Sequence, residues 1–349
     1  MTSGRFILEK ELLSSGVMKI EIFGAGMAGC YLACLLERSE HNYKIYEKYK
    51  NSKCPSPCAF GWANYSKVKK LCNLIDVDSD SYVLMRPKEA IVNGIDFKIR
   101  DVVIFDKPRF INDMRKSLDV VYEVPNNYSG DLIVDATGHS RALLRGVDIK
   151  YLVTKQYRVK VTTLDSDCIY IYAKPYGYAW AFPLSKDEWH IGAGGFTQEQ
   201  VNFLIGQLNK TYEIKFNDIE CACKSPIIWD YTVSYFKQIY GINIVGIGEA
   251  GGFVSAFGEG NTLALETAKC LHEAIEYGAD DIDLIIDIYS DLVWKETSWV
   301  ITQYDFVETL NESWFKALFK VRDVIKVANM RNLDASVWKG LKLMWRLRK

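Results

Sequence analysis

The first hydrophobic pattern along the chain is that of a strand, a helix and a second strand. Residues 19–23 alternate polar and apolar side chains and run into a glycine-rich turn, residues 30–36 are almost wholly apolar, and residues 43–46 have the composition of a strand. A short strand, a tight turn and a buried helix followed by another strand predict a βαβ unit.

The pattern stays mixed as far as residue 146. The further elements predicted there are a hairpin of 88–92 and 95–99 around Asn93-Gly94, a strand over 102–105, a helix from Pro108, and strands near Val120 and Leu132. Tight Asn-Gly turns between short apolar runs are the strongest local signal for a hairpin.

The character of the chain changes near residue 151. Four β-rich runs separated by turn residues predict a meandering antiparallel sheet, and they span 152–161, 168–173, 178–183 and 189–192. From 242 a buried strand and a glycine-rich loop precede a helix over 262–274, and the chain is helical after 281. We therefore expect an α/β fold with a discontinuous first domain (18–146 and 242–280), an antiparallel-sheet domain (147–241), a helical C-terminal region (281–349) and an N-terminal extension (1–17).

The turn after the first strand has the spacing GxGxxG, formed by Gly24, Gly26 and Gly29. Glycines there let backbone N–H groups approach a pyrophosphate, and the N-terminus of the following helix adds positive partial charge. The second strand ends in Glu47, whose carboxylate can accept hydrogen bonds from ribose hydroxyls. The strand–turn–helix context predicts a dinucleotide site.

A second GxGxxG string, Gly246, Gly248 and Gly251, lies late in the chain without a βαβ pattern behind it. The string alone is therefore no evidence for a second nucleotide site. Its continuation over 253–261 has little side-chain bulk and leads into a helix. Such a loop allows close backbone approach to a flat ligand beside a second helix N-terminus.

Composition narrows the class of partner. A formal net charge of −1 gives no basic field, so we expect no nucleic-acid partner. Residues 1–17 carry Glu9, Lys10 and Glu11 inside their only apolar stretch, so we predict no secretory leader. The nine cysteines include no pair of CxxC motifs, and together with the missing leader this indicates a reducing compartment. No window reaches the roughly 18 uncharged apolar residues of a spanning helix. We expect a cytoplasmic protein, with a peripheral position on the inner face of the membrane left open.

Three motifs occur together in the order found in flavoprotein hydroxylases and their relatives: GxGxxG with its downstream Glu, the sequence DATG at 135–138, and GEAG at 248–251. Within that superfamily, PYGYAWAFP at 175–183 resembles the PxxYxWxFP signature of the geranylgeranyl reductases, which saturate isoprenoid chains. CAFG at 58–61 resembles their CxxG flavin-contact segment, and GEGN at 258–261 their GEGI turn. The resemblance covers roughly residues 18–290 and implies the hydroxylase-like flavoprotein fold, with a Rossmann-type FAD-binding domain.

The resemblance implies a role for each matching position. Ala28 would lie at the pyrophosphate of FAD, Glu47 on the adenosine ribose, and Ala136 near the adenine side. Glu249 would hold ribityl or ribose hydroxyls. The full set of implied FAD-binding residues is Gly24, Gly26, Ala28, Gly29, Glu47, Lys48, Cys58, Ala59, Gly61, Lys107, Arg109, Ala136, Gly138, Gly248, Glu249, Gly258, Gly260 and Asn261.

Within that set, Cys58, Ala59 and Gly61 would lie along the flavin, and the backbone of Gly260 and Asn261 would face its pyrimidine ring. Three positions depart from the family pattern. Glu249 stands where the family has Asp, Asn261 replaces an apolar residue, and Lys107 replaces an Arg. Arg109 is the alternative cation for the diphosphate, and Lys lacks the bidentate fork of Arg.

Tyr176, Tyr178, Trp180 and Phe182 alternate as on a half-buried strand, where they would share one face. The alternation alone favours core packing, whereas the resemblance favours the wall of a substrate pocket. His139 is expected in a loop and His190 on the sheet surface. Cys54 and Cys58 could ligate a metal, but structural zinc needs four soft ligands and histidines are few, so we expect no metal site.

The C-terminal residues 337–349 place Trp338, Leu341 and Trp345 on one helical face with basic residues around them. Two interpretations are open: the helix lies on an anionic membrane surface, or it packs onto the body of the protein.

The sequence thus favours an FAD-dependent reductase of isoprenoid (geranylgeranyl) double bonds in lipids or prenyl quinones. The alternatives are an FAD-dependent aromatic monooxygenase and a non-enzymatic flavin- or lipid-binding protein. The electron donor, NAD(P)H or ferredoxin, stays open because no second complete βαβ unit for a nicotinamide is seen.

Overall fold

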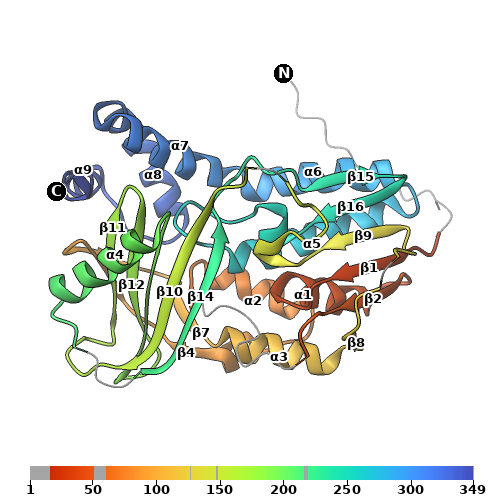
Figure 1. Ribbon diagram of the computed structural model, residues 1–349, viewed down its shortest axis with the longest axis horizontal. Coiled ribbons are helices and arrows are strands. Elements are labelled where there is room, and N and C mark those ends of the chain that lie inside the picture. Colours follow the sequence, from red (N-terminus) through yellow and green to blue (C-terminus); the bar gives the residue numbers. More distant parts are fainter. Residues whose placement is uncertain (1–15, 51–59, 126, 147, 216–218, 349) are drawn as a thin grey trace.

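A computed structural model describes residues 16–50, 60–125, 127–146, 148–215 and 219–348 (Figure 1). The first sheet has six strands in the order β15-β16-β9-β1-β2-β8. Five of them are parallel, and β15 pairs antiparallel with β16 at one edge. Their bounds are Phe236–Ile239, Ile242–Gly246, Leu132–Asp135, Lys19–Phe23, Asn42–Tyr46 and Val120–Val121. The βαβ unit expected from the sequence is confirmed.

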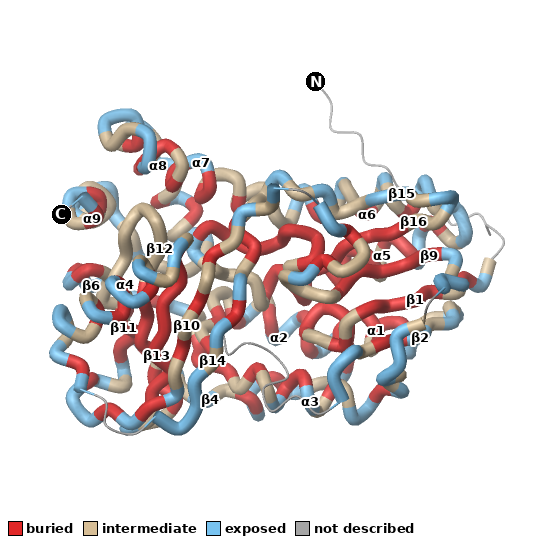
Figure 2. The backbone as a smooth tube through the Cα atoms, in the orientation of Figure 1, coloured by how far each residue is buried: buried red, intermediate tan, exposed pale blue. Residues whose placement is uncertain are grey.

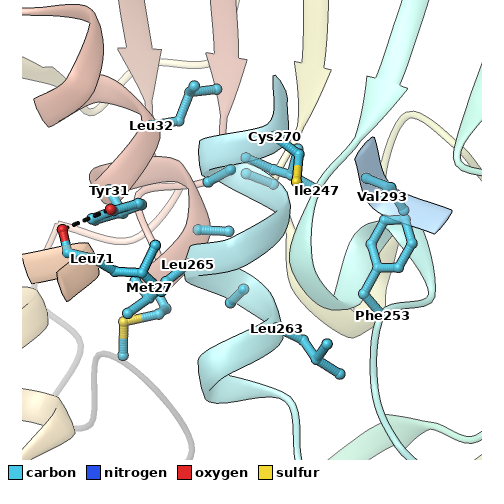
Figure 3. Packing of buried hydrophobic residues seen from close by; sticks show 14 of the residues in the cluster. Met27, Tyr31, Leu32, Leu71, Ile247, Phe253, Leu263, Leu265, Cys270 and Val293 are labelled. Atoms are coloured by element: carbon cyan, nitrogen blue, oxygen red, sulfur yellow. Dashed lines mark hydrogen bonds between the residues drawn. The ribbon is translucent and has the colours of Figure 1, made fainter. Parts of the chain in front are cut away.

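Two helices cover one face of this sheet, α1 (Met27–Leu36) and α5 (Asn261–Gly278). Nearly all of α1 is buried, because it packs against the sheet, against α5 and against α3 (Lys107–Ser117). Figure 3 shows this packing, in which the Tyr31 hydroxyl donates a hydrogen bond of 2.8 Å to the Leu71 carbonyl in α2 (Tyr65–Asn73). An apolar helix on an apolar sheet explains the uninterrupted hydrophobic sequence of 30–36.

The second sheet has seven strands in the order β14-β10-β13-β12-β11-β5-β6. Their bounds are Ile219–Ile228, Tyr151–Lys160, Glu188–Gly195, Gly177–Pro183, Cys168–Lys174, Glu89–Val92 and Ile95–Lys98. The expected hairpin is present as β5 and β6, and β5 pairs parallel with β11. By pairing, this hairpin therefore belongs to the second sheet, although it lies in the first stretch of sequence.

Helix α4 (Gln198–Thr211) covers the outer face of the second sheet and starts with a capping box formed by Thr197 and Gln200. The inner face of the second sheet is directed toward the first domain. A small third sheet lies between that face and the first domain, and its strands are β3 (Gly61–Trp62), β7 (Val103–Phe105) and β4 (Val83–Met85).

The C-terminal region is helical, as expected, in α6 (Ile282–Thr297), α7 (Trp299–Glu312), α8 (Trp314–Met330) and α9 (Val337–Arg348). Helix α6 packs on α5, and α7, α8 and α9 extend to the end of the molecule where the second sheet lies (Figures 1 and 2). Within the described ranges, no helix combines the length and the apolar character needed to cross a bilayer.

Candidate cofactor and substrate site

The first glycine turn combines tight packing with one open position. Gly24 has φ +105°, and a Cβ there would lie 2.4 Å from the carbonyl oxygen of Ala136; a Cβ on Gly29 would lie 2.0 Å from the carbonyl oxygen of Gly24. A side chain at either position would clash with backbone atoms and destabilise the turn. Gly26 differs, since a Cβ at this position would meet no atom of the described residues within 4 Å. It is the residue before the first turn of α1, so among those residues the space in front of this helix N-terminus is open.

Glu47 lies at this turn, as the sequence predicts, and it also holds the turn together. One carboxylate oxygen, Oε2, accepts from the backbone N–H of Ala25 at 3.1 Å and from the Arg115 guanidinium at 3.0 Å. Arg115 also donates from Nε to the Ala25 carbonyl at 2.5 Å. Both side chains are largely buried. Sequence reasoning missed Arg115, because no local signal links positions 47 and 115. The ribose contact of Glu47 stays a prediction.

The ends of three parallel strands bring other predicted residues together. A Cβ on Gly248 would lie 3.0 Å from Cβ of Ala28, and a Cβ on Gly29 would lie 3.1 Å from Cβ of Ala136. The N–H of Gly248 donates to the Thr267 hydroxyl at 2.9 Å, which ties the late glycine loop to α5. The turns after β1, β9 and β16 thus meet at one edge of the sheet, where α/β proteins bind their ligands.

Glu249 lies beside this edge. Its Oε1 accepts from the N–H of Ile228 at 2.9 Å, and its Oε2 is 3.8 Å from the position that a Cβ on Gly138 would occupy. Burial raises the pKa of Glu249 to about 7, and the nearby Lys107 acts in the opposite direction. A buried carboxyl that takes up a proton near neutrality is suited to hydrogen bonding with hydroxyl groups as donor or acceptor.

Of the two candidate cations, only Lys107 lies near Glu249 and is buried. Arg109 is directed elsewhere: its guanidinium donates to the Ser81 carbonyl at 3.1 Å and lies over the Tyr82 ring, 4.9 Å from the centroid. Lys48 is exposed, with its ammonium over the Tyr49 ring. Cys58 and Ala59, like Cys54, lie outside the described residues.

The glycine loop before α5 meets the second sheet. A Cβ on Gly258 would lie 1.8 Å from the Tyr178 hydroxyl, and Gly258 has φ +79°, so the loop and β12 are in direct contact. Glu259 forms an ion pair with Arg331 at the end of α8. Gly260 precedes the first turn of α5, and a Cβ there would make only an ordinary contact with Val254. Asn261 is the first residue of α5. The loop is therefore held from three sides.

Three aromatic side chains form a continuous row on the inner face of β12. The ring centroids of Tyr178 and Trp180 are 5.6 Å apart, and those of Trp180 and Phe182 are 6.2 Å apart in a stacked arrangement. The row crosses from the glycine loop to β3, where a Cβ on Gly61 would lie 3.2 Å from the Phe182 ring. We call Tyr178, Trp180 and Phe182 the aromatic wall.

Tyr176 is not part of this wall, which corrects the expectation of four rings on one face. It lies in the turn before β12 and packs with the residues under α4, on the opposite side of the sheet. The intervening Gly177 has φ +151°, and a Cβ there would lie 2.1 Å from the carbonyl oxygen of Gly194. The strand alternation therefore begins only after Gly177.

His190 on β13 is a second correction, since it is 1% exposed rather than on the sheet surface. Its Nδ1 accepts from the Trp180 indole N–H at 3.2 Å, so the neutral ring carries its proton on Nε2. Nε2 has no hydrogen-bond partner among the described residues. Burial lowers the pKa of His190 to about 3. The ring stays neutral at physiological pH, and it positions Trp180. His139 lies in the short turn Gly138–Ser140, as expected.

Comparison with known proteins shows which proteins this chain is similar to in sequence and in fold. No family model matches the chain. A curated relative, an uncharacterized protein of Methanocaldococcus jannaschii, is 24% identical and covers 80% of this chain and 88% of its own length. A solved structure of a geranylgeranyl bacteriochlorophyll reductase-like protein from Thermoplasma acidophilum superposes with a TM-score of 0.67 at 16% identity, covering 94% of this chain and 96% of that one.

Two further structures are similar over most of the chain. A probable FAD-dependent monooxygenase from Pseudomonas aeruginosa has a TM-score of 0.60 at 14% identity, covering 84% of this chain and 96% of that one. CmlS, a flavin-dependent halogenase, has a TM-score of 0.62 at 14% identity, and the match covers 93% of this chain and 67% of the CmlS chain. At these identities the similarity establishes the fold. The hydroxylase-like flavoprotein fold expected from the sequence is therefore confirmed.

Proposed function

We propose that this chain is an FAD-dependent oxidoreductase that saturates double bonds in the isoprenoid chains of lipids or prenyl quinones. The observation that carries the proposal is the aromatic wall, which lies between the glycine loop before α5 and strand β3. These are the two segments that the family resemblance assigns to the flavin ring. The wall would therefore hold a hydrocarbon chain against that ring.

The residues around the first glycine turn fit an FAD molecule. Gly26 leaves open space in front of the helix N-terminus, where a pyrophosphate is favoured by the backbone N–H groups and the helix dipole. Glu47 and Glu249 would bind the ribose and ribityl hydroxyls, and Lys107 would supply positive charge nearby. The fold similarity to flavin-dependent proteins supports the same cofactor.

Bound in its reduced form, FAD would supply a hydride to one carbon of the double bond, and the other carbon would take up a proton. The chain itself contributes ring surface, which holds hydrocarbon by burial at about 25 cal/mol per Å² without specific polar contacts. Two polar groups of the same sheet are already bonded, because Trp180 donates to His190 and the Thr154 hydroxyl donates to the Ser225 carbonyl at 2.6 Å. His190 is a poor proton donor for the second carbon, because burial lowers its pKa and its Nδ1 already accepts from the Trp180 N–H.

The test uses dithionite-reduced protein, because dithionite replaces the physiological donor, whether NAD(P)H or ferredoxin. Geranylgeranyl compounds should gain two hydrogen atoms for each double bond, as measured by mass spectrometry of the products. Trp180→Ala should lower activity on long prenyl chains more than on short ones, and Trp180→Phe, which keeps a ring, should have a smaller effect. Trp294→Ala changes an exposed tryptophan on α6 and should leave activity unchanged.

An aromatic monooxygenase is the second candidate, favoured by the similarity of the fold to the Pseudomonas protein. Such a substrate needs polar groups that fix one ring carbon. Oxygen consumption driven by NADPH, with hydroxylation of a small aromatic and no change in any prenylated lipid, would replace the reductase proposal by this one.

A further inference from the structure

The end of the molecule formed by α8 and α9 exposes aromatic side chains among basic ones. On α8, Phe315 and Phe319 are 65% and 74% exposed, and their rings form an edge-to-face pair 5.5 Å apart. Arg322, Lys326 and Met330 continue the same helical stripe and are also exposed. Exposed large apolar residues in such a row indicate a binding surface.

Helix α9 packs onto the body of the protein with one face, and its other face is exposed. Met344 and Leu347 are buried against the body of the protein. A Cβ on Gly340 would lie 2.8 Å from Ile325, so α9 packs closely on α8. The opposite side carries Trp338, which is 77% exposed, and Trp345, which is 51% exposed, with Lys342 between them. Leu341, expected on the same face, is half-buried.

Charge is concentrated at this end of the chain. Residues 314–349 contain ten Lys and Arg against two Asp and Glu, a net charge of +8, so the remaining residues carry −9 to give the total of −1. Only two of the described cations of α8, Lys320 and Lys326, pair with a carboxylate, Asp305 and Asp323 respectively. The positive field of this end is therefore largely uncompensated by its neighbours.

A groove lies at the same end, lined by Lys174, Tyr176, Phe203, Trp314, Leu347 and Arg348 among others. Tyr176 lies in the turn that leads into β12, the strand that carries the aromatic wall. The Arg348 guanidinium lies over the Trp314 ring, 5.7 Å from its centroid. The groove therefore lies on the α4 side of the second sheet, where α4, α8 and α9 come together.

We propose that the exposed faces of α8 and α9 dock on the surface of an anionic lipid bilayer. Tryptophan and phenylalanine insert at the headgroup level, and lysine and arginine approach lipid phosphates. A second copy of the chain fits less well, because lysine is depleted in protein interfaces, whereas interfacial membrane helices are rich in it. The proposal does not depend on the chemistry of the site.

Deleting the C-terminal residues is a poor test, since it would remove Arg331, the partner of Glu259 in the glycine loop, and the buried face of α9. Point substitutions on the exposed side avoid this. Trp338→Ser and Lys342→Glu remove an aromatic ring and reverse a charge on the exposed face of α9. The matched controls, Trp294→Ser on α6 and Lys237→Glu on β15, make the same changes at exposed positions elsewhere.

The assay is co-sedimentation of the full chain with phosphatidylcholine vesicles that contain or lack phosphatidylglycerol. Binding should require phosphatidylglycerol and fall as salt rises. A basic residue near an anionic surface contributes about a fivefold factor to partitioning, so Lys342→Glu should weaken binding by about tenfold or more. Trp338→Ser should also weaken it, whereas both controls should bind like the wild type.

Equal binding to both kinds of vesicle, or equal binding by all four variants, would overturn the proposal. Concentration-dependent dimerisation that Trp338→Ser abolishes, without vesicle binding by the wild type, would assign the face to a second copy instead. Reductase activity on detergent-solubilised lipid is measured separately, so failure of the membrane proposal is distinguishable from failure of the proposed function.

Discussion

Gly26→Val should abolish flavin binding and leave the fold intact. The backbone of Gly26 has φ −84°, which any residue can adopt, and a Cβ there would meet no atom within 4 Å in the part of the chain that the structure describes. Valine at the position before a helix costs about 1 kcal/mol relative to a good capping residue. The side chain would nevertheless occupy the space in front of the α1 N-terminus. The loss of two backbone N–H bonds to a pyrophosphate, each worth about 1.5–3 kcal/mol, amounts to about 3–6 kcal/mol.

That loss corresponds to a weakening of FAD affinity by about two to four orders of magnitude. The absorbance spectrum of the purified protein and chromatography of the released cofactor measure occupancy, and urea unfolding of the apoprotein measures the fold. Gly29→Ala is the control, since its Cβ would lie 2.0 Å from the Gly24 carbonyl oxygen and should destabilise the apoprotein itself. Full FAD occupancy in Gly26→Val would refute the reasoning, as would an apoprotein as unstable as Gly29→Ala.

Two further predictions concern buried carboxyl groups. Burial raises the pKa of Glu249 from 4.5 to about 7, so the ionised form costs folding free energy that appears as pH rises from about 4.5 to 7. Glu249→Gln should therefore stabilise the apoprotein by up to about 3 kcal/mol above pH 7 and by nothing below pH 4.5, and a pH-independent difference in urea unfolding would contradict this. Lys67→Met removes the cation 2.7 Å from the buried Glu266 and should destabilise the protein by about 3–5 kcal/mol. The double variant Lys67→Met/Glu266→Leu should recover most of the lost free energy of unfolding. If the double variant were as unstable as Lys67→Met alone, this would argue against the ion pair.

The parts of the fold that the sequence predicts are those with local signals. Strand β1 has the bounds expected from its alternation, and α5 starts within one residue of its expected position. The glycine turn is identified by spacing and context together. Helix α4 was not predicted, although Thr197 and Gln200 form the capping-box pattern that could have identified its start.

The parts that sequence reasoning missed depend on long-range pairing. The partner of the β5–β6 hairpin is β11, more than seventy residues further along the chain, and no local pattern specifies it. The pairing of Glu47 with Arg115 is equally remote. Tyr176 was misplaced because the alternation was extended across Gly177, whose φ of +151° is visible only in the backbone. His190 was misplaced because a histidine in a strand does not itself show which face is covered.

The position of His190 also bears on how the wall is built. A Cβ on Gly192 would lie 2.6 Å from the Trp180 ring, so the indole approaches a glycine of the neighbouring strand closely and a side chain there would displace it. The Trp180 indole N–H also donates to Nδ1 of His190, and this hydrogen bond fixes the orientation of the indole ring. A large ring that is fixed in this way presents a rigid apolar surface and loses little conformational entropy when a ligand binds. The same fold occurs in flavin-dependent proteins with different chemistry, so the side chains on this face of the second sheet, rather than the cofactor domain, must decide which substrate is accepted. A rigid wall of three rings whose indole N–H is already satisfied supports the proposed hydrocarbon substrate rather than a polar aromatic one.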